Sequence, residues 1–121
     1  MCIRDSLKGP DEFGHDGDAI GKMKNIEEID ERFFGTLLEN ISTEDVVIVI
    51  SADHSTPCIN KGHSDDPVPL LVSGNKIKND ETERFTEHES QKGEIGMLEG
   101  CLLYTSPSPR DLSTSRMPSS A

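Results

Sequence analysis

Three of the four histidines in this sequence lie in clusters that also contain aspartate. They occur in the segments Asp11-Glu-Phe-Gly-His15-Asp-Gly-Asp18, Ser51-Ala-Asp53-His54-Ser-Thr-Pro57 and His63-Ser-Asp-Asp-Pro67. Carboxylate and imidazole groups without thiolates suit Mn²⁺, Zn²⁺, Co²⁺ or Mg²⁺ and do not distinguish among these ions. The candidate metal ligands are therefore Asp11, His15, Asp53, His54 and His63.

Each cluster taken alone has a simpler explanation. Asp53 can cap a helix, while His15 and His63 can be solvated side chains in loops. A calcium-binding EF-hand loop is excluded, because Asp16-Gly-Asp18 lacks the glycine and the terminal glutamate at the required offsets. His88 is expected to be exposed and Cys58 to serve packing. The metal hypothesis rests on the combination, since all three clusters are placed at expected ends of strands.

The two ends of the chain are expected to be foreign to the protein. One inverted nucleotide repeat can encode both Met1-Cys-Ile-Arg-Asp5 and Leu102-Leu-Tyr-Thr105, as a translated sequencing adapter does. We expect residues 1–6 to be an adapter-derived scar, residues 7–100 the C-terminal part of a metalloenzyme domain, and residues 101–121 an adapter-derived disordered tail. The alternative is a native Ser- and Pro-rich tail, which cannot build a core either.

Charge and cysteine content restrict the possible classes of partner. The net charge of −11 argues against a nucleic-acid backbone as partner and suits a protein that gathers cations. No apolar run approaches the ~18 residues of a membrane span. With the ends set aside only Cys58 remains, which excludes an intrachain disulfide and indicates a reducing, cytoplasmic compartment.

A long helix is expected to follow the first cluster. The segment Leu7–Pro10 is interpreted as the end of a strand, and Asp16 or Asp18 as the cap of the next helix. From Ala19 to about Asn40, apolar residues recur at steps of three and four, which predicts an amphipathic helix packed on one side. That stripe contains Ile20, Met23, Ile26, Ile29, Phe33 and Leu37, widened by Phe34 and Leu38, and Gly35 is a point at which the helix can end early.

Two apolar runs predict strands. Five consecutive β-branched residues, Val46–Ile50, favour a strand buried on both faces inside a parallel sheet. Val68–Val72 predicts a second strand, which Pro69 restricts to an edge or an irregular start. A loop at 73–80, a short acidic helix or turn at 81–90 and a further element at 93–100 follow. The expected fold class is α/β, a partial doubly wound and mostly parallel sheet with flanking helices.

The number of candidate ligands indicates two metal ions rather than one. Five protein ligands are too many for one catalytic ion that must keep open positions, and too few for two complete shells. Two-metal sites with ions ~3.5–4 Å apart serve phosphoryl transfer by clamping the attacking and leaving oxygens. Further ligands are therefore expected from elsewhere in the intact protein.

At these residues the chain resembles the alkaline phosphatase superfamily, and within it the archaeal-type 2,3-bisphosphoglycerate-independent phosphoglycerate mutases. The resemblance rests on three motifs in the family's order: residues 8–18, 51–57 and 63–70. It extends through Phe85-Thr-Glu87 to Lys92-Gly93 and covers nearly all of residues 7–100. We therefore expect the chain to be a C-terminal fragment of such an enzyme.

The resemblance implies that Asp11, His15 and His63 bind one metal, while Asp53 and His54 bind the second. Two divalent ions are implied, with Mn²⁺ favoured, and no 2,3-bisphosphoglycerate. The nucleophilic serine and a further aspartate belong to an N-terminal segment without a counterpart here. This chain is therefore expected to hold no catalytic residue, and its substrate-binding residues are unknown.

The implied reaction interconverts 3-phosphoglycerate and 2-phosphoglycerate through a phosphoserine intermediate, a step of glycolysis and gluconeogenesis. The chain alone is expected to have no turnover and to bind metal weakly or not at all. Two alternatives stay open. One is another phosphatase or phosphomutase of the same superfamily, and the other is a non-catalytic, acidic cation-binding module. The substrate is expected to be a small phosphorylated molecule, and the oligomeric state is not indicated.

Overall fold

The computed structural model describes residue 3, residues 5–98 and the backbone of residues 115–117. These residues fall into two units, each treated by itself. The first unit comprises Met1–Glu39 and Thr56–His63, and the second comprises Asn40–Ser55 and Ser64–Ala121. Among the described residues, no helix has the length and apolar character needed to cross a membrane.

The first unit begins with helix α1, Gly9–Asp16, where the sequence pattern had predicted the end of a strand. That prediction is wrong, because Pro10 occupies the first turn, where a missing backbone N–H and a fixed φ favour a helix. The helix ends at Gly17, which adopts a left-handed conformation with φ 73°. The N–H of Gly17 donates to the Gly14 carbonyl, and the N–H of Asp18 donates to that of Phe13.

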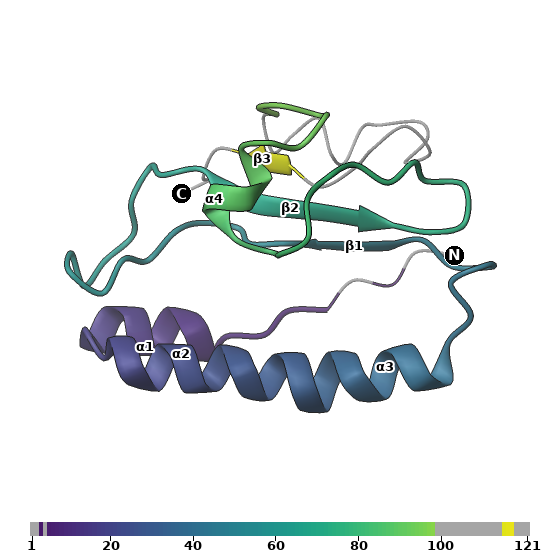
Figure 1. Ribbon diagram of the computed structural model, residues 1–121. Helices are drawn as coiled ribbons and strands as arrows, with labels where there is room; N and C mark the ends of the chain where they lie inside the picture. The colour runs from purple at the N-terminus through teal and green to yellow at the C-terminus, as the bar shows by residue number, and fades with distance from the viewer. Residues whose placement is uncertain (1–2, 4, 99–114, 118–121) are drawn as a thin grey trace. The chain divides into compact units, whose positions relative to one another are not determined.

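Helix α2, Ala19–Glu28, starts at the cap expected from the sequence. The Asp18 carboxylate accepts a hydrogen bond of 2.9 Å from the N–H of Gly21. The helical path continues through the π-helical segment η1, Ile29–Phe34, into α3, Gly35–Asn40. The predicted helix is thus confirmed to Asn40, and Gly35 does not end it. Figure 1 shows α1 and α2 running side by side.

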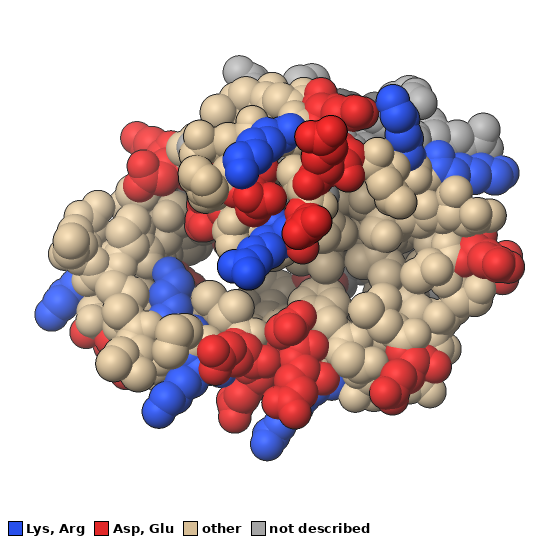
Figure 2. All heavy atoms as spheres, viewed as in Figure 1, with Lys and Arg blue, Asp and Glu red and all other residues tan. Residues whose placement is uncertain are grey.

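The side chains of the apolar stripe on these helices are less buried than predicted. No residue of α2, η1 or α3 is buried, and the prediction of a helix packed on one side is not met. The most exposed members are Ile20, Met23 and Leu38, at 63%, 53% and 53%. The acidic residues of these helices are exposed, namely Glu27, Glu28, Asp30 and Glu31. Figure 2 shows acidic side chains gathered in the lower part of the view, where Figure 1 has these helices.

The second unit contains a small antiparallel sheet. Strand β1, Ile48–Ser51, pairs with β2, Val68–Ser73, in the register Ile48 to Ser73 and Ser51 to Leu70. The backbone of β3, Ser115–Met117, pairs with the other side of β2, also antiparallel. Strand β3 lies in the segment expected to be a disordered tail, and the foreign origin of that segment stays a prediction. Helix α4, Glu87–Ser90, completes the unit.

The α/β class is confirmed, but these strands do not confirm a mostly parallel sheet. A parallel crossover needs a connection of about a dozen or more residues, usually a helix. The residues between β1 and β2 form only turns and the isolated bridge between Ser55 and Ser64. Strand β1 is also half-exposed rather than buried on both faces, with Val49 44% exposed.

The core of the second unit lies on β2. Val68, Leu70 and Val72 are buried together with Ile77, and Ile95 and Leu98 pack against them. Pro69 is the second residue of β2, and β2 is the central strand of the sheet rather than an edge. The predicted helix at 81–90 is shorter than expected, because it begins only after Thr86, whose hydroxyl accepts from the N–H of Glu89. In the described part of 93–100, residues 93–95 form a bend and a turn and Met97 is a single bridge residue, so no helix or strand forms in residues 93–98.

Candidate metal centre

Asp11 and His15 lie one turn apart on α1, so both side chains project from the same face of the helix. The sequence pattern had placed them on a turn between a strand and a helix, yet their predicted proximity is met. His15 Nε2 lies 3.4 Å from Asp11 Oδ1. Asp11 is 26% exposed and His15 is 45% exposed, so the pair is accessible to an ion from solvent.

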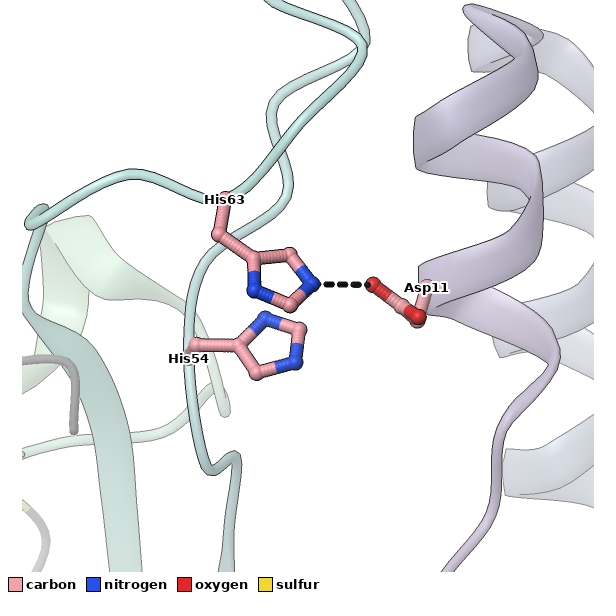
Figure 3. A group of neighbouring side chains, drawn as sticks. All are labelled: Asp11, His54 and His63. Carbon is pink, nitrogen blue, oxygen red and sulfur yellow. Dashed lines mark ion pairs between the residues drawn. The ribbon is translucent and has the colours of Figure 1, made fainter. Parts of the chain in front are cut away.

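His63 contacts the Asp11 carboxylate as well. It lies at the end of the loop Thr56–His63, which is the second segment of the first unit. Its Nε2 atom lies 3.4 Å from Asp11 Oδ1, as Figure 3 shows. The rings of His15 and His63 are neighbours, with their centroids 5.1 Å apart. Three of the five predicted ligands are therefore brought together within the first unit, although 48 residues separate His15 from His63 in sequence.

The backbone carbonyl of Lys61 determines which ring nitrogen of His15 faces Asp11 and can act as the ligand atom. His15 Nδ1 lies 3.1 Å from the carbonyl oxygen of Lys61. A carbonyl oxygen only accepts hydrogen bonds, so Nδ1 carries the proton in this contact. In the neutral ring, Nε2 then presents its lone pair toward the Asp11 carboxylate. Metal-binding histidines commonly donate their second ring N–H to a carbonyl or carboxylate in this way.

The spacing of the donor atoms fits a bound cation better than direct hydrogen bonds. A distance of 3.4 Å between Nε2 and Oδ1 exceeds the ~2.7–3.2 Å of an N–H to O hydrogen bond. Two ligands each about 2.1 Å from a tetrahedral ion lie ~3.4 Å from each other. The donors of Asp11, His15 and His63 thus match a divalent ion in chemistry, and the two distances to Asp11 Oδ1 match the spacing of neighbouring ligands.

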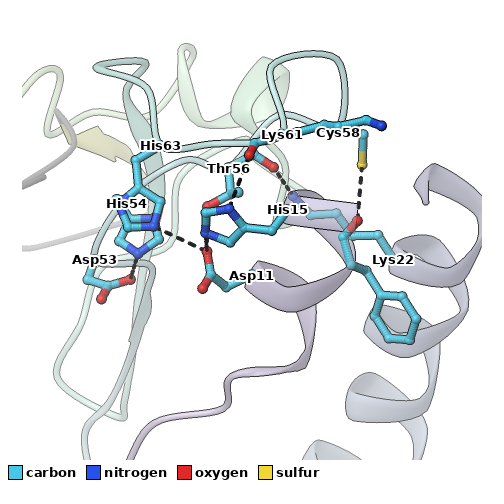
Figure 4. Close-up of polar contacts among 10 residues, drawn as sticks. Asp11, His15, Lys22, Asp53, His54, Thr56, Cys58, Lys61 and His63 are labelled. Atoms are coloured by element: carbon cyan, nitrogen blue, oxygen red, sulfur yellow. Dashed lines mark hydrogen bonds and ion pairs between the residues drawn. The ribbon is translucent and has the colours of Figure 1, made fainter. Parts of the chain in front are cut away.

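The loop that carries His63 is anchored to α1 and α2 by polar contacts, drawn in Figure 4. Thr56 is 4% exposed, and its hydroxyl donates to Asp11 Oδ1 at 2.7 Å. Lys22 Nζ donates to the Thr56 carbonyl at 2.8 Å. The long side chain of Lys22 thus reaches from α2 to this loop. Cys58 is partly buried and its thiol lies 4.0 Å from the Phe13 carbonyl, which agrees with a packing role.

Asp53 and His54 belong to the second unit, directly after β1. His54 Nε2 lies 3.5 Å from Asp53 Oδ1. Only 15% of the His54 side chain is exposed, whereas Asp53 is 74% exposed. The predicted placement of this pair after a strand is met, and the assignment of both residues to a second metal stays a prediction.

Sequence reasoning missed two contributors to the cluster of Asp11, His15 and His63. Neither the Thr56 hydroxyl nor the Lys61 carbonyl has the chemistry of a typical ligand, and both lie more than 40 residues from their partners. The signal for Thr56 was its position two residues after His54, inside the second motif. His88 is exposed, as predicted.

Comparisons with known proteins identify the family to which the chain is related. A sequence model described as the Metalloenzyme superfamily matches residues 2–104. The chain is 48% identical over 94 residues to a 2,3-bisphosphoglycerate-independent phosphoglycerate mutase of Thermococcus kodakarensis, and 46% identical to one of Pyrococcus abyssi. Each alignment covers 78% of this chain and 23% of the relative, so the chain spans about a quarter of the length of these curated relatives.

A solved structure gives the same indication. The structure of the PH0037 protein from Pyrococcus horikoshii matches with a TM-score of 0.76 and 43% sequence identity. That match covers 79% of this chain and 29% of the other. The resemblance to the bisphosphoglycerate-independent mutases, first seen in the three motifs, is confirmed by these relatives. The chain belongs to the metalloenzyme superfamily.

Proposed function

We propose that this chain forms part of the metal centre of a 2,3-bisphosphoglycerate-independent phosphoglycerate mutase. The observation that carries the proposal is the convergence of Asp11 Oδ1 with the Nε2 atoms of His15 and His63, each at 3.4 Å. The relatives that match the chain are named as such mutases, which supports the reaction class. The substrates are then 3-phosphoglycerate and 2-phosphoglycerate.

In this proposal Asp11, His15 and His63 hold one divalent ion, while Asp53 and His54 contribute to a second. A divalent ion bound there lowers the pKa of a serine nucleophile and offsets negative charge on the phosphoryl group. The nucleophile is assigned to a segment with no counterpart in this chain. Ser51, Ser55 and Ser64 are not assigned that role. Mn²⁺ is the favoured ion because of the resemblance to the mutases, and the oxygen and imidazole donors suit it as they also suit Zn²⁺, Co²⁺ or Mg²⁺.

The chain's own residues supply orientation and charge. The hydrogen bond from His15 Nδ1–H to the Lys61 carbonyl turns Nε2 toward Asp11, so that Nε2 is the ligand atom of the neutral ring. Asp11 supplies the negative charge that two neutral imidazoles lack, so the three donors together attract a cation. The net charge of −11 further concentrates cations and disfavours a nucleic-acid partner.

The proposal also includes the sheet topology and the cellular setting of the whole enzyme. A doubly wound, mostly parallel sheet and a cytoplasmic, glycolytic setting are what membership of the mutase family implies. The α/β class found here is consistent with the first of these, and the setting is proposed from the relatives.

The proposal is tested by grafting this segment into an active relative. The 94 residues of the Thermococcus kodakarensis mutase that align with this chain are replaced by the matching residues of this chain. We expect the chimera to convert 3-phosphoglycerate to 2-phosphoglycerate with Mn²⁺ and without bisphosphoglycerate. In the chimera, Asp11→Asn should abolish conversion, because it removes the shared anionic ligand.

His88→Ala is the matched control, since it removes an exposed histidine outside the cluster. It should leave conversion unchanged. Release of inorganic phosphate without 2-phosphoglycerate contradicts the mutase assignment and favours a phosphatase of the same superfamily. A folded chimera that binds Mn²⁺ but has no activity supports the cation-binding alternative.

A further inference from the structure

Thr56 is a buried polar residue in direct contact with the candidate metal ligand Asp11. It is 4% exposed, and its hydroxyl donates a hydrogen bond of 2.7 Å to Asp11 Oδ1. Hydrogen bonds to an ionised carboxylate are shorter and stronger than bonds between neutral groups. The contact joins two segments that lie 45 residues apart, so it is made by the fold rather than by local sequence.

The oxygen that Thr56 contacts is the one that faces both imidazoles. Asp11 Oδ1 lies 3.4 Å from the Nε2 atoms of His15 and His63. The terminal torsion of an aspartate has a broad rotational profile and does not hold the carboxylate plane by itself. The hydroxyl of Thr56 therefore selects the carboxylate orientation in which Oδ1 is turned toward the two ring nitrogens.

Thr56 is itself held from two sides. Its carbonyl oxygen accepts a hydrogen bond of 2.8 Å from Lys22 Nζ, which ties the residue to α2. On the other side α1 comes so close that a Cβ atom added to Gly14 would overlap the Thr56 carbonyl oxygen. Glycine at position 14 is what permits this approach. Helix α1 and the Thr56–His63 loop thus hold the hydroxyl against Asp11.

We propose that Thr56 is a positioning residue for the metal centre, acting through Asp11. This inference rests on the proposed function, because it assumes that Asp11 ligates a metal. Outer hydrogen-bond partners of metal ligands typically contribute about 10–100-fold in metal affinity. Thr56 has the geometry of such a partner, and the loss of its hydroxyl lowers affinity without removing any ligand.

The test uses the full 121-residue chain and Mn²⁺. Paramagnetic broadening of the His15 and His63 ring signals in NMR spectra reports binding even at millimolar concentrations, and its midpoint gives the affinity. The comparison is Thr56→Val, which keeps the shape but loses the hydroxyl, against Thr56→Ser, which keeps the hydroxyl and loses the methyl. Thr43→Val makes the same chemical change at an exposed residue of the second unit.

We expect Thr56→Val to raise the Mn²⁺ midpoint about tenfold or more. Thr56→Ser and Thr43→Val should remain close to the unchanged chain. In an Asp11→Asn background, Thr56→Val should cause no further loss, because the oxygen it orients is no longer a charged ligand. A role in packing alone predicts the opposite, namely that Thr56→Ser, which loses the methyl, weakens binding while Thr56→Val, which keeps the shape, does not.

Two failures are distinguishable. Broadening of both rings with equal midpoints for the unchanged chain and Thr56→Val overturns the inference about Thr56 and leaves the metal centre standing. If the unchanged chain alone shows no broadening, as its expected weak binding allows, the same series is measured in the chimera, and absence of broadening at His15 and His63 there overturns the metal centre itself. If Thr56→Val loses its native circular dichroism spectrum, Thr56→Ala provides the same comparison without a branched side chain.

Discussion

His15 Nδ1 and the carbonyl oxygen of Lys61 lie 3.1 Å apart and join α1 to a loop 46 residues later. Lys61 has a φ of 51°, in the left-handed region that non-glycine residues rarely adopt. Its N–H donates to the Pro57 carbonyl at 3.0 Å, which holds the turn. The ring orientation of His15 therefore depends on an uncommon backbone conformation rather than on a second side chain.

Substitution of Lys61 tests this dependence. Lys61→Gly keeps the carbonyl and adopts a positive φ without strain, so metal binding should be retained. Lys61→Pro fixes φ near −65° and removes the N–H, so the carbonyl turns away from His15 and binding weakens. The Mn²⁺ midpoint of both variants checks this expectation. Equal midpoints show that the carbonyl does not orient the ring.

Removal of His15 itself should be more damaging. We expect His15→Ala to lower Mn²⁺ affinity by at least about tenfold, since even outer partners of ligands contribute that much. Calorimetric titration at constant pH measures the change. His88→Ala is the control, and an equal loss in that variant would point to a nonspecific charge effect.

Metal binding should weaken as the pH falls. Imidazole and carboxylate groups bind a cation only when deprotonated, so protons compete with Mn²⁺ for Asp11, His15 and His63. A titration series from neutral to acidic pH should therefore show a rising midpoint. In His63→Ala the dependence should be shallower, because one proton fewer is displaced. A midpoint that is independent of pH contradicts histidine ligation.

Two glycines of the helices should respond oppositely to alanine. A Cβ at Gly14 meets the backbone of Thr56, and overpacking of this kind costs about 1–3 kcal/mol. A Cβ at Gly35 has only the Asp30 carbonyl within reach, at 3.9 Å, and glycine inside a helix costs roughly 0.5–1 kcal/mol relative to alanine. Gly14→Ala should therefore destabilise the chain and Gly35→Ala should stabilise it. Urea unfolding followed by circular dichroism measures both, and the same sign for the two variants refutes the account.

The pair of Glu89 and Lys92 gives a prediction for acid pH. A hydrogen bond of 2.9 Å from the Lys92 ammonium group lowers the pKa of Glu89 below its ordinary 4.5. A lowered pKa in the folded chain means that the pair stabilises α4 above the ordinary pKa and loses this effect as the pH falls through the folded value. Lys92→Met should raise the pKa of Glu89, as followed by NMR titration of its side chain. An unchanged pKa shows that the contact is absent in solution.

The sequence predicted the start of α2 and the extent of the helical path because both depend on local chemistry. Asp18 caps as expected, and the apolar period runs to Asn40. Helix α1 was missed because Gly-Pro and Gly14 are typical helix breakers. Here Pro10 occupies a position in the first turn that tolerates it, and Gly14 serves a close contact with Thr56.

The sequence pattern does not indicate whether two neighbouring strands run parallel or antiparallel. A run of β-branched residues indicates burial, but the partner and its orientation depend on the connection. The ligand cluster was predictable in part, since residue type marked Asp11, His15 and His63. The Thr56 hydroxyl and the Lys61 carbonyl were not, because a hydroxyl and a backbone oxygen carry no ligand signature until the fold brings them near.

The wide turn at η1 has a consequence for the register of the helix that follows. The N–H of Gly35 reaches back to the carbonyl of Asp30, five residues earlier, where an ordinary turn would reach four. The turn therefore contains one residue more than an α-helical turn. Compared with the same sequence in an uninterrupted α-helix, every later side chain is offset by about 100° around the helix axis. Deleting a single residue there would let an uninterrupted α-helix form while Leu37 and Leu38 keep the side of the helix that they occupy now.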